Sequence, residues 1–487
     1  MALTENDRLS VFVIALGAFI GTAAMSSINI ALPLIMQEFD STLGVVSWVL
    51  SGYMLVLAGF CVIIGRLADT RGLKRTFLEG TLLFSVGSLL CFLAWDILIL
   101  IMARVLQALG AAMFIASGPA LISATIAGSG RAVGQSWVTS ASLFGTAAGI
   151  GAGGIISGLV GWRPLFVIMI VLGVGVYLIG RVCLAGPAPR PRSAPFDYTG
   201  SALLICTLTA LLAGLSLDYH PGISDTIPRI LYGSAILCAA AFVLNVRRVE
   251  DPVISLALFR DRSFSAGLAS SFLMYIIFGG IMFLLPFVLI MGLHQPVITA
   301  GIVLMTASVA GILVAPVAGY LADRYGSRPV CITAVILTGC TLWGFAEVLQ
   351  GSVLHGIALI ALFRIAFALY SAPSTTLVLD SCPKDRVGSG SGILLTGRYA
   401  AYTIGIALFL LVFESVVYGA GLPDDGSLIV PRLTPALMKS GYHATFLFAA
   451  ALTVPALVCS YFAHGRRDEA QDPGPAPADD RTCEPGF

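Results

Sequence analysis

The sequence predicts an all-α protein that crosses a lipid bilayer fourteen times. Two observations support this fold class. Of the 487 residues, 57% are hydrophobic and only 11% are charged, whereas soluble domains carry about 25% charged residues. The hydrophobic residues are also gathered into long runs, close to the roughly 20 residues that a helix needs to span the hydrocarbon core of a bilayer.

The apolar runs form three groups along the chain. After a charged start, six runs cover residues 11–35, 46–65, 76–95, 97–123, 134–158 and 164–184. A linker rich in Pro and Arg leads to two more runs, at residues 198–217 and 229–246. The last six runs cover residues 264–290, 299–322, 329–349, 354–379, 388–417 and 442–463.

This order predicts two six-helix bundles that are separated by an inserted helix pair. We expect an N-terminal bundle at residues 11–184, a linker with two extra transmembrane helices at 185–263, and a C-terminal bundle at 264–463. Residues 1–10 and 464–487 lie outside the bundles, and the second segment is rich in Pro, Asp and Gly, so we expect a disordered tail. The first run lacks a cleavage site of small residues and exceeds the core of a signal peptide, so it is expected to remain as the first helix.

The positive charges predict the orientation of the chain. An even number of spans places both termini on one side of the membrane. Most of the 27 Lys and Arg residues lie in the terminal segments and in the connections on that same side. Because positive charge accumulates on the cytoplasmic side, we predict a multi-pass protein of the cell membrane with both termini in the cytoplasm.

Several other classes of protein lack support in this sequence. The net charge of +1 gives no case for nucleic-acid binding. The ten cysteines include no C-x-x-C pair and the five histidines show no H-E-x-x-H spacing, so neither a disulfide framework nor a metal site is expected. Neither G-x-S-x-G nor a phosphate-binding loop is present, which argues against an enzyme and against a nucleotide cofactor.

A dense charge cluster separates the second and third runs. Residues 65–75 read G-R-L-A-D-T-R-G-L-K-R, and residues 319–328 repeat the pattern as G-Y-L-A-D-R-Y-G-S-R. Such charges are typical of turns that only fix topology, but two copies at equivalent places indicate an internal repeat of the kind found in secondary transporters. The residues of interest in the two loops are Gly65, Asp69, Arg71, Gly72, Lys74, Arg75, Asp323, Arg324, Gly326 and Arg328.

This pattern resembles the signature loop between helices 2 and 3 of the major facilitator superfamily. The resemblance extends over nearly the whole chain and is strongest to the fourteen-helix drug:proton antiporter branch. It implies that the loop Asp and basic residues form a cytoplasmic latch, which bonds across to the other half when the outward face is open. Thr70 and Leu73 depart from the family pattern, which has an Arg and a further basic residue at these places.

Three arginines, Arg104, Arg364 and Arg398, fall inside predicted spans. Charge inside a bilayer is costly, so each is a functional candidate by default; the alternative is a structural Arg that binds the carbonyls of a broken helix. The segment from Arg104 resembles the family's helix-4 motif R-x-x-Q-G-x-G-A-A, which implies that Arg104 faces the central cavity and is linked to proton transfer. Gln107 lies one turn further on the same face. Arg364 occupies the equivalent place in the second half, and Arg398 resembles the Arg of the family's penultimate helix.

Two further segments resemble family motifs with changes. Residues 149–154 read G-I-G-A-G-G, similar to the antiporter motif G-P-x-x-G-G, with Gly149, Gly153 and Gly154 kept and Ile150 at the Pro position. Close packing of small residues is the alternative explanation for these glycines. The segment S-S-I-N-I-A-L-P contains Asn29 and resembles the family's helix-1 motif, in which an acidic residue stands at the position of Ala24.

The resemblance implies a secondary transporter that exports a small amphipathic solute by alternating access in exchange for protons. Because Ala24 cannot titrate, the proton carrier would lie elsewhere. The remaining acidic residues near the spans all lie toward span ends, and they are Glu79, Glu347, Asp380 and Glu414. Glu79 is also spaced to form an ion pair with Arg75. Proton-coupled uptake and facilitated diffusion remain open, as does a membrane sensor or scaffold that transports nothing. Three buried arginines without an opposing acid favour an anionic, zwitterionic or neutral solute. We expect a functional monomer whose partners are this solute, protons and lipid.

Overall fold

The computed structural model describes residues 5–126, 129–184, 197–217, 226–249, 256–348, 353–383, 387–419 and 435–464. Within these ranges, fourteen α-helices are long and apolar enough to cross a membrane. The predicted all-α fold with fourteen spans is therefore confirmed. The predicted tail lies outside the described residues from position 465 onward, as does most of the linker that precedes the inserted pair.

The helices follow the order of the predicted runs. The first six are α1 (Glu5–Glu38), α2 (Leu43–Arg71), α3 (Leu73–Phe92), α4 (Ile97–Thr125), α5 (Ser129–Val160) and α6 (Arg163–Cys183). The inserted pair is α7 (Tyr198–Leu217) and α8 (Thr226–Val246). The last six are α9 (Arg262–Phe287), α10 (Val297–Tyr325), α11 (Ser327–Val348), α12 (Val353–Asp380), α13 (Val387–Gly419) and α14 (Pro435–Phe462), with a short 3₁₀ helix, η1 (Leu256–Arg260), before α9 and a π-helical turn, η2 (Val288–Gly292), after it.

The two repeated loops turn on equivalent glycines. Gly72 separates α2 from α3 with a φ of 102°, and Gly326 separates α10 from α11 with a φ of 90°. These angles are strained for residues with a Cβ atom but accessible to glycine. Each glycine N–H donates to a carbonyl oxygen four residues earlier, of Ala68 or Ala322, and so closes the preceding helix. The second glycine of the repeated motif is thus required by the turn itself.

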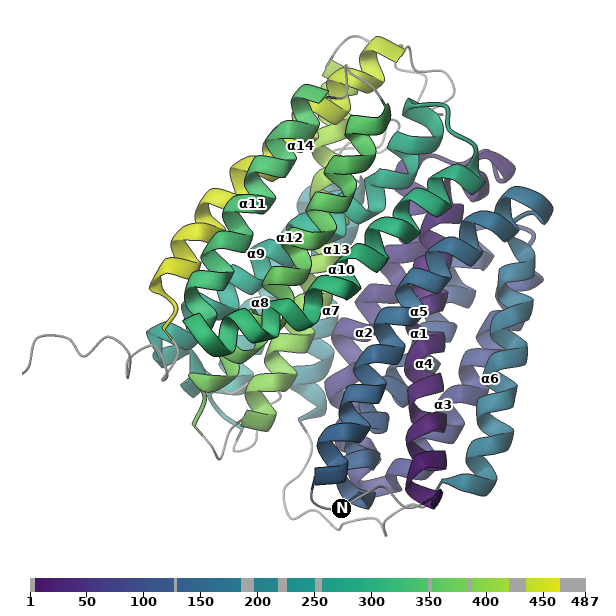
Figure 1. Ribbon diagram of the computed structural model, residues 1–487, viewed down its shortest axis with the longest axis vertical. Helices are drawn as coiled ribbons and strands as arrows, with labels where there is room; N and C mark the ends of the chain where they lie inside the picture. Colours follow the sequence, from purple (N-terminus) through teal and green to yellow (C-terminus); the bar gives the residue numbers. More distant parts are fainter. Residues whose placement is uncertain are drawn as a thin grey trace, which may run out of the picture.

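The last six helices repeat the packing of the first six. In the first group α1 packs on α5, α2 on α4, and α3 on both α4 and α6; in the second, α9 packs on α13, α10 on α12, and α11 on both α12 and α14. The two groups lie side by side, purple to blue and teal to yellow in Figure 1. They meet along two seams, α2 against α13 and α5 against α10. We call the end of the bundle where α1 begins the terminal face and the opposite end the far face.

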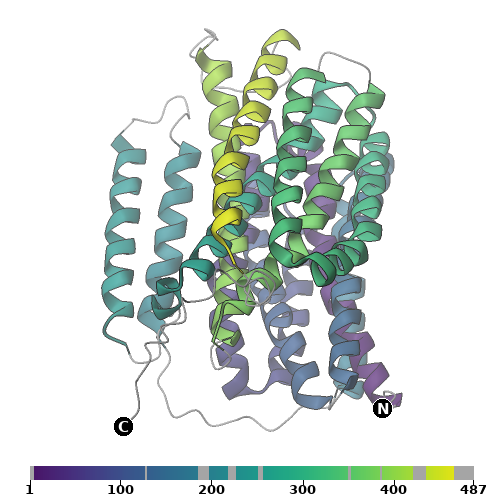
Figure 2. The same ribbon diagram turned by 60° about the vertical axis from the view of Figure 1, so that its left-hand side comes forward.

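The inserted pair covers one of these seams. Helices α7 and α8 form a hairpin that stands at the edge of the molecule (Figure 2). Helix α7 contacts both α2 and α13, and Ala58, Leu208 and Ala400 from the three helices form one buried cluster. A Cβ atom at Gly59 would lie 2.5 Å from a side-chain carbon of Ile205, so α7 packs directly on the α2 backbone. The α5–α10 seam has no such cover in the part of the chain described.

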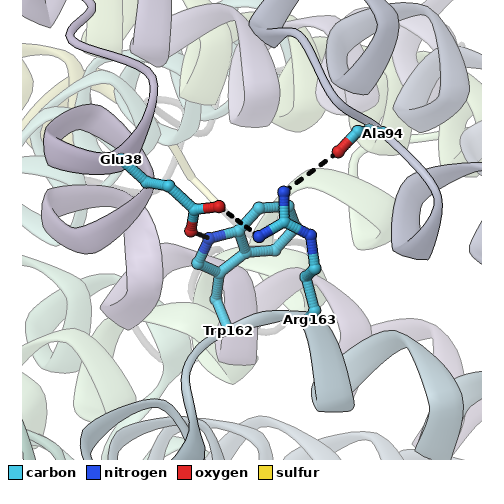
Figure 3. Close-up of polar contacts among 4 residues, drawn as sticks. All are labelled: Glu38, Ala94, Trp162 and Arg163. Atoms are coloured by element: carbon cyan, nitrogen blue, oxygen red, sulfur yellow. Dashed lines mark hydrogen bonds and ion pairs between the residues drawn. The ribbon is translucent and has the colours of Figure 1, made fainter.

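A clamp joins three connections at the far face. The clamp consists of Glu38, Trp162 and Arg163 (Figure 3). The carboxylate of Glu38, at the end of α1, accepts hydrogen bonds from the Trp162 indole N–H and from the Arg163 guanidinium. The guanidinium also donates to the carbonyl oxygen of Ala94 at 3.1 Å, between α3 and α4, and stacks on the Trp162 ring. The far ends of α1, α3, α4 and α6 are therefore held as one unit.

The clamp makes a testable contribution to stability. We expect Glu38→Ala to lower the free energy of unfolding by about 1–3 kcal/mol, because the buried Trp162 indole loses its acceptor. Glu38→Gln keeps an acceptor oxygen and should cost less. Thermal unfolding of the purified protein in detergent, followed by tryptophan fluorescence, measures both. Equal midpoints for the wild type and Glu38→Ala would show that the clamp contributes nothing.

Candidate functional site

Arg104 lies inside the first six-helix group. Its side chain has 0% exposure. Its Nε donates to the Val49 carbonyl oxygen at 3.2 Å, one Nη donates to the Gln107 side-chain oxygen, and the guanidinium stacks 4.3 Å from the centre of the Tyr53 ring. Gln107 in turn donates to Ser88 at 2.7 Å. The resemblance implied that Arg104 faces the central cavity. In the structure its hydrogen bonds join α2, α3 and α4, and its side chain has no solvent-accessible surface.

Arg398 on α13 is also held by protein oxygens. Its Nε donates to the Ser271 hydroxyl of α9 at 3.2 Å, and one Nη lies 3.1 Å and 2.9 Å from the hydroxyls of Ser374 and Thr375 on α12. The guanidinium stacks on Tyr275, 4.8 Å from the ring centre. Arg398 therefore joins α9, α12 and α13, and its charge is shared among neutral hydrogen-bond acceptors.

Arg364 on α12 differs from the other two arginines. One Nη lies 3.8 Å from the Met282 sulfur, which is a weak acceptor, and the guanidinium lies 5.3 Å from the centre of the Phe278 ring. The Nε atom is buried and has no hydrogen-bond partner. Among the described residues, neither a carboxylate nor a carbonyl oxygen bonds this guanidinium. Arg364 is thus a half-buried cation with a buried, unused Nε donor.

Asn29, on α1 of the first half, contacts the same methionine as Arg364. Its side-chain nitrogen donates to the Met282 carbonyl oxygen at 2.8 Å, so α1 of the first half is bonded to α9 of the second. The side-chain oxygen of Asn29 is buried without a donor. Asn29 and Arg364 therefore contact the same residue, Met282, and each has an unsatisfied polar atom.

Five aromatic rings surround this point from the second half. We call Tyr275, Phe278, Phe363, Phe367 and Tyr402 the aromatic cluster. Phe278 and Phe367 are stacked with ring centres 3.8 Å apart and planes 13° apart, and the other rings lie 5.2–6.3 Å from one of these two. Tyr275 and Phe278 are only half-buried although their helix, α9, packs against α1, α12, α13 and α14. Arg364 and Arg398 stack on these two rings.

The first loop makes contacts within its own half. Lys74 donates to the Arg181 carbonyl oxygen of α6 at 3.3 Å, and Arg75 forms the i,i+4 ion pair with Glu79 at 2.7 Å. Arg71 ends α2 and is exposed, and a Cβ atom at Gly65 would meet nothing within 4 Å. The side chain of Asp69 lies outside the described part of the structure.

The second loop is attached in an equivalent way. Arg324 donates to the Tyr320 hydroxyl at 3.1 Å, and the Arg328 guanidinium stacks 4.7 Å from the centre of the Tyr461 ring on α14. Asp323 is exposed. Since α6 and α14 hold equivalent places in the two groups, Lys74 and Arg328 each join a loop to the last helix of its own half.

The glycines of α5 face two different helices. A Cβ atom at Gly149 would lie 2.6 Å from the Ala23 carbonyl oxygen, and one at Gly153 would lie 2.8 Å from the Ser27 Cα, both on α1. A Cβ atom at Gly154 would instead lie 2.6 Å from the Gly301 Cα on α10. The motif therefore serves packing within the first half and, through Gly154, close contact between the halves at the far face.

Glu414 is the acid whose environment the sequence did not reveal. Glu79 is paired and Glu347 is exposed, whereas Glu414 is only 8% exposed and makes no hydrogen bond or ion pair within the described residues. It follows Ala400 and Ala407 at intervals of seven, which places all three near one face of α13. Ala400 packs with α2 and α7. The spacing of seven residues from two buried alanines was the feature of the sequence that could have predicted the burial of Glu414.

Comparisons with known proteins agree with this architecture. The family model described as Major Facilitator Superfamily matches residues 14–406. The chain is 28% identical over 432 residues to the riboflavin transporter RibZ of Clostridioides difficile (88% of this chain, 92% of that protein). It is 30% identical over 413 residues to the multidrug resistance protein Stp of Mycobacterium tuberculosis (83% and 76%). In structure it is similar to a bacterial homologue of the lysosomal transporter Spinster, with a TM-score of 0.68 and 14% identity, over 97% of this chain and 99% of the other.

The crossing of α5 and α10 can be tested by adding side-chain volume. We expect Gly154→Val to separate the far ends of these helices, because its Cβ would overlap the Gly301 backbone. Gly175→Val on α6 is the matched control, since a Cβ there meets nothing within 4 Å. Distances between spin labels at the far ends of α5 and α10 report the change. Identical distance distributions for Gly154→Val and the control would contradict the close crossing.

Proposed function

Because the chain belongs to the Major Facilitator Superfamily, we propose that it exports a small amphipathic solute across the cell membrane in exchange for protons. The single observation that carries the proposal is the pair of repeated six-helix halves, which meet along the α2–α13 and α5–α10 seams and are bonded to each other through Asn29 and the Met282 carbonyl oxygen. Similarity to a multidrug resistance protein supports export. Similarity to a riboflavin transporter supports the second candidate, uptake or facilitated diffusion of a small metabolite.

Transport would proceed by alternating access between the two faces. The terminal face is taken as cytoplasmic because the basic residues are concentrated there. Close contact between Gly154 and Gly301 supports a closed far face, and Lys74 and Arg328 each make contacts within their own halves. This arrangement supports an inward-facing state. In the outward-facing state, the loop acids Asp69 and Asp323 would bond across the cytoplasmic face.

The latch can be tested through the balance of the two states. We expect Asp69→Asn to shift the population toward the inward-facing state, because a charge-assisted hydrogen bond contributes roughly 1.5–3 kcal/mol, or about tenfold or more in the equilibrium. Spin-label distances across the cytoplasmic face measure the shift. Unchanged distances together with full transport would reduce the loop to a topology signal.

Proton exchange requires a group that changes its charge, and Glu414 is our candidate. A carboxylate without a partner is costly to bury, so closure of the far face over Glu414 favours its protonated, neutral form. Opening of the same face would let water reach the group and stabilise the carboxylate. A proton taken up from outside would thereby be carried through closure of the far face. Net exchange then requires that Glu414 release this proton toward the cytoplasmic side, in the inward-facing state, before the far face opens again. Arg104, within the first half, would support this cycle by positioning α2, α3 and α4.

Glu414→Gln tests this role directly. The amide cannot release a proton, so we expect exchange of labelled solute across proteoliposomes at equal pH to continue while accumulation driven by a pH gradient is lost. Glu347→Gln is the control, because Glu347 also lies near the far end of its helix but is exposed. Gradient-driven accumulation that survives in Glu414→Gln would remove this residue from the coupling pathway.

A counterflow screen in proteoliposomes tests the function as a whole. The purified protein is exposed to a library of amphipathic solutes, with and without an imposed pH gradient. We expect exchange with at least one solute class and accumulation that follows the gradient. Exchange that ignores the gradient would favour facilitated diffusion. Absence of flux for every solute, together with a stable protein partner, would favour a membrane sensor or scaffold.

A further inference from the structure

We propose that Arg364, Asn29 and the aromatic cluster form a binding site for a flat aromatic acid that carries a hydroxyl or N–H group beside its acidic group. This inference rests on the proposed transport function and names the class of its solute. The site combines the Arg364 cation, the free acceptor oxygen of Asn29 and the stacked rings of Phe278 and Phe367. Arg364 and Asn29 both contact Met282.

The charge of Arg364 calls for an anionic partner. A guanidinium inside a membrane protein is stabilised when each donor is satisfied and its charge is opposed. Arg364 has one long contact with sulfur and a buried Nε without a partner. A carboxylate or phenolate oxygen matches this need, because charge-assisted bonds to a guanidinium are among the strong hydrogen bonds of proteins. A lipophilic cation would increase the unopposed charge.

Asn29 specifies a donor next to the acid. Its side-chain nitrogen is already used by the Met282 carbonyl oxygen, which fixes the orientation of the amide. The remaining oxygen is buried without a donor, and an unsatisfied buried acceptor carries a free-energy cost that a ligand donor removes. Arg364 contacts the sulfur of the same methionine whose carbonyl oxygen binds Asn29, so Met282 links the amide of Asn29 to the guanidinium of Arg364. A hydroxyl or N–H group adjacent to the acid satisfies both.

The aromatic cluster is the reason for proposing a ligand with a flat aromatic ring. Phe278 carries the Arg364 guanidinium on one side and is stacked on Phe367. Tyr275 and Phe278 are both only half-buried, so the cluster keeps ring surface that a flat ligand can contact.

Arg398 reaches the same cluster through Tyr275, but its Nε and one Nη already donate to hydroxyl and carbonyl oxygens of the protein. Arg104 also has one buried Nη without a partner, but it lies inside the first half with 0% exposure. Among the arginines at the aromatic cluster, Arg364 is therefore the one with a buried unused donor for a ligand.

Direct binding to the purified protein in nanodiscs tests the site without reference to transport. The probe is 3-hydroxy-2-naphthoate, a fluorescent aromatic acid with a hydroxyl beside its carboxylate. We expect saturable binding to the wild type and weaker binding of 2-naphthoate, which lacks the hydroxyl. The trimethyl-2-naphthylammonium cation should not compete. Competition by the cation as strong as that by the acid would overturn the proposal.

Variants then assign the charge to one arginine. We expect Arg364→Gln to weaken binding of the probe by about tenfold or more, since a charge-assisted bond is lost, while Arg364→Lys keeps part of the affinity. Lys439→Gln, which removes an exposed positive charge on α14, is the control for net charge. A loss in Arg398→Gln equal to that in Arg364→Gln would overturn the assignment. Thermal unfolding of each variant separates lost binding from lost folding.

The two proposals fail in different ways. Solute exchange in proteoliposomes without binding of the naphthoate probe would reject the aromatic-acid class and leave transport standing. Binding of the probe without flux of any solute would reject transport and leave the site standing. Binding that is unchanged in both Arg364→Gln and Asn29→Ala would reject the site itself.

Discussion

The cost of a positive charge in a medium of low dielectric constant shapes the interior of this protein. Each of the three intramembrane arginines needs partners, and none of them has a carboxylate among the described residues. Arg104 and Arg398 donate to carbonyl, hydroxyl and amide oxygens and stack on ring faces, and each thereby ties three helices of its own half together, although one Nη of Arg104 has no partner. Arg364 is left with a buried, unused Nε donor beside Met282, whose carbonyl oxygen binds Asn29 of the other half. Two arginines build the scaffold, and the third keeps capacity for a ligand.

The seams between the halves follow from the internal repeat. Because α2 and α10 are equivalent, as are α5 and α13, the α2–α13 and α5–α10 seams are related by exchange of the halves. The sequence makes the two seams different. Close approach of backbones at Gly154 and Gly301 joins α5 to α10 at the far face, whereas α7 packs over α2 and α13 through Ile205 and Leu208. Small residues permit such close contact inside a membrane, where apolar burial gives little drive for helices to associate.

The covered seam gives the inserted hairpin a physical role. Helix α7 contacts one helix of each half, so it shields their junction from lipid on one side of the molecule (Figure 2). An amphipathic solute dissolved in the bilayer would meet helix α7 or α8 there. The α5–α10 seam is built from α5 and α10 alone in the described structure, and its contact at Gly154 lies toward the far face. The two sides of the transporter therefore present different surfaces to lipid.

The sequence by itself determined the features that depend on local chemistry. Runs of apolar residues fixed fourteen spans, since the bilayer dictates helix length, and the repeated loop predicted two equivalent halves. The i,i+4 spacing predicted the pair of Arg75 with Glu79. Only the tertiary structure decided which helix each side chain meets. Arg104 lies fully inside the first half, and Glu414 is buried. Gly149 packs against α1 whereas Gly154 packs against α10, and Asn29 forms a hydrogen bond with α9. Helical spacing gives the face on which a residue lies, but its partner comes from packing between segments hundreds of residues apart.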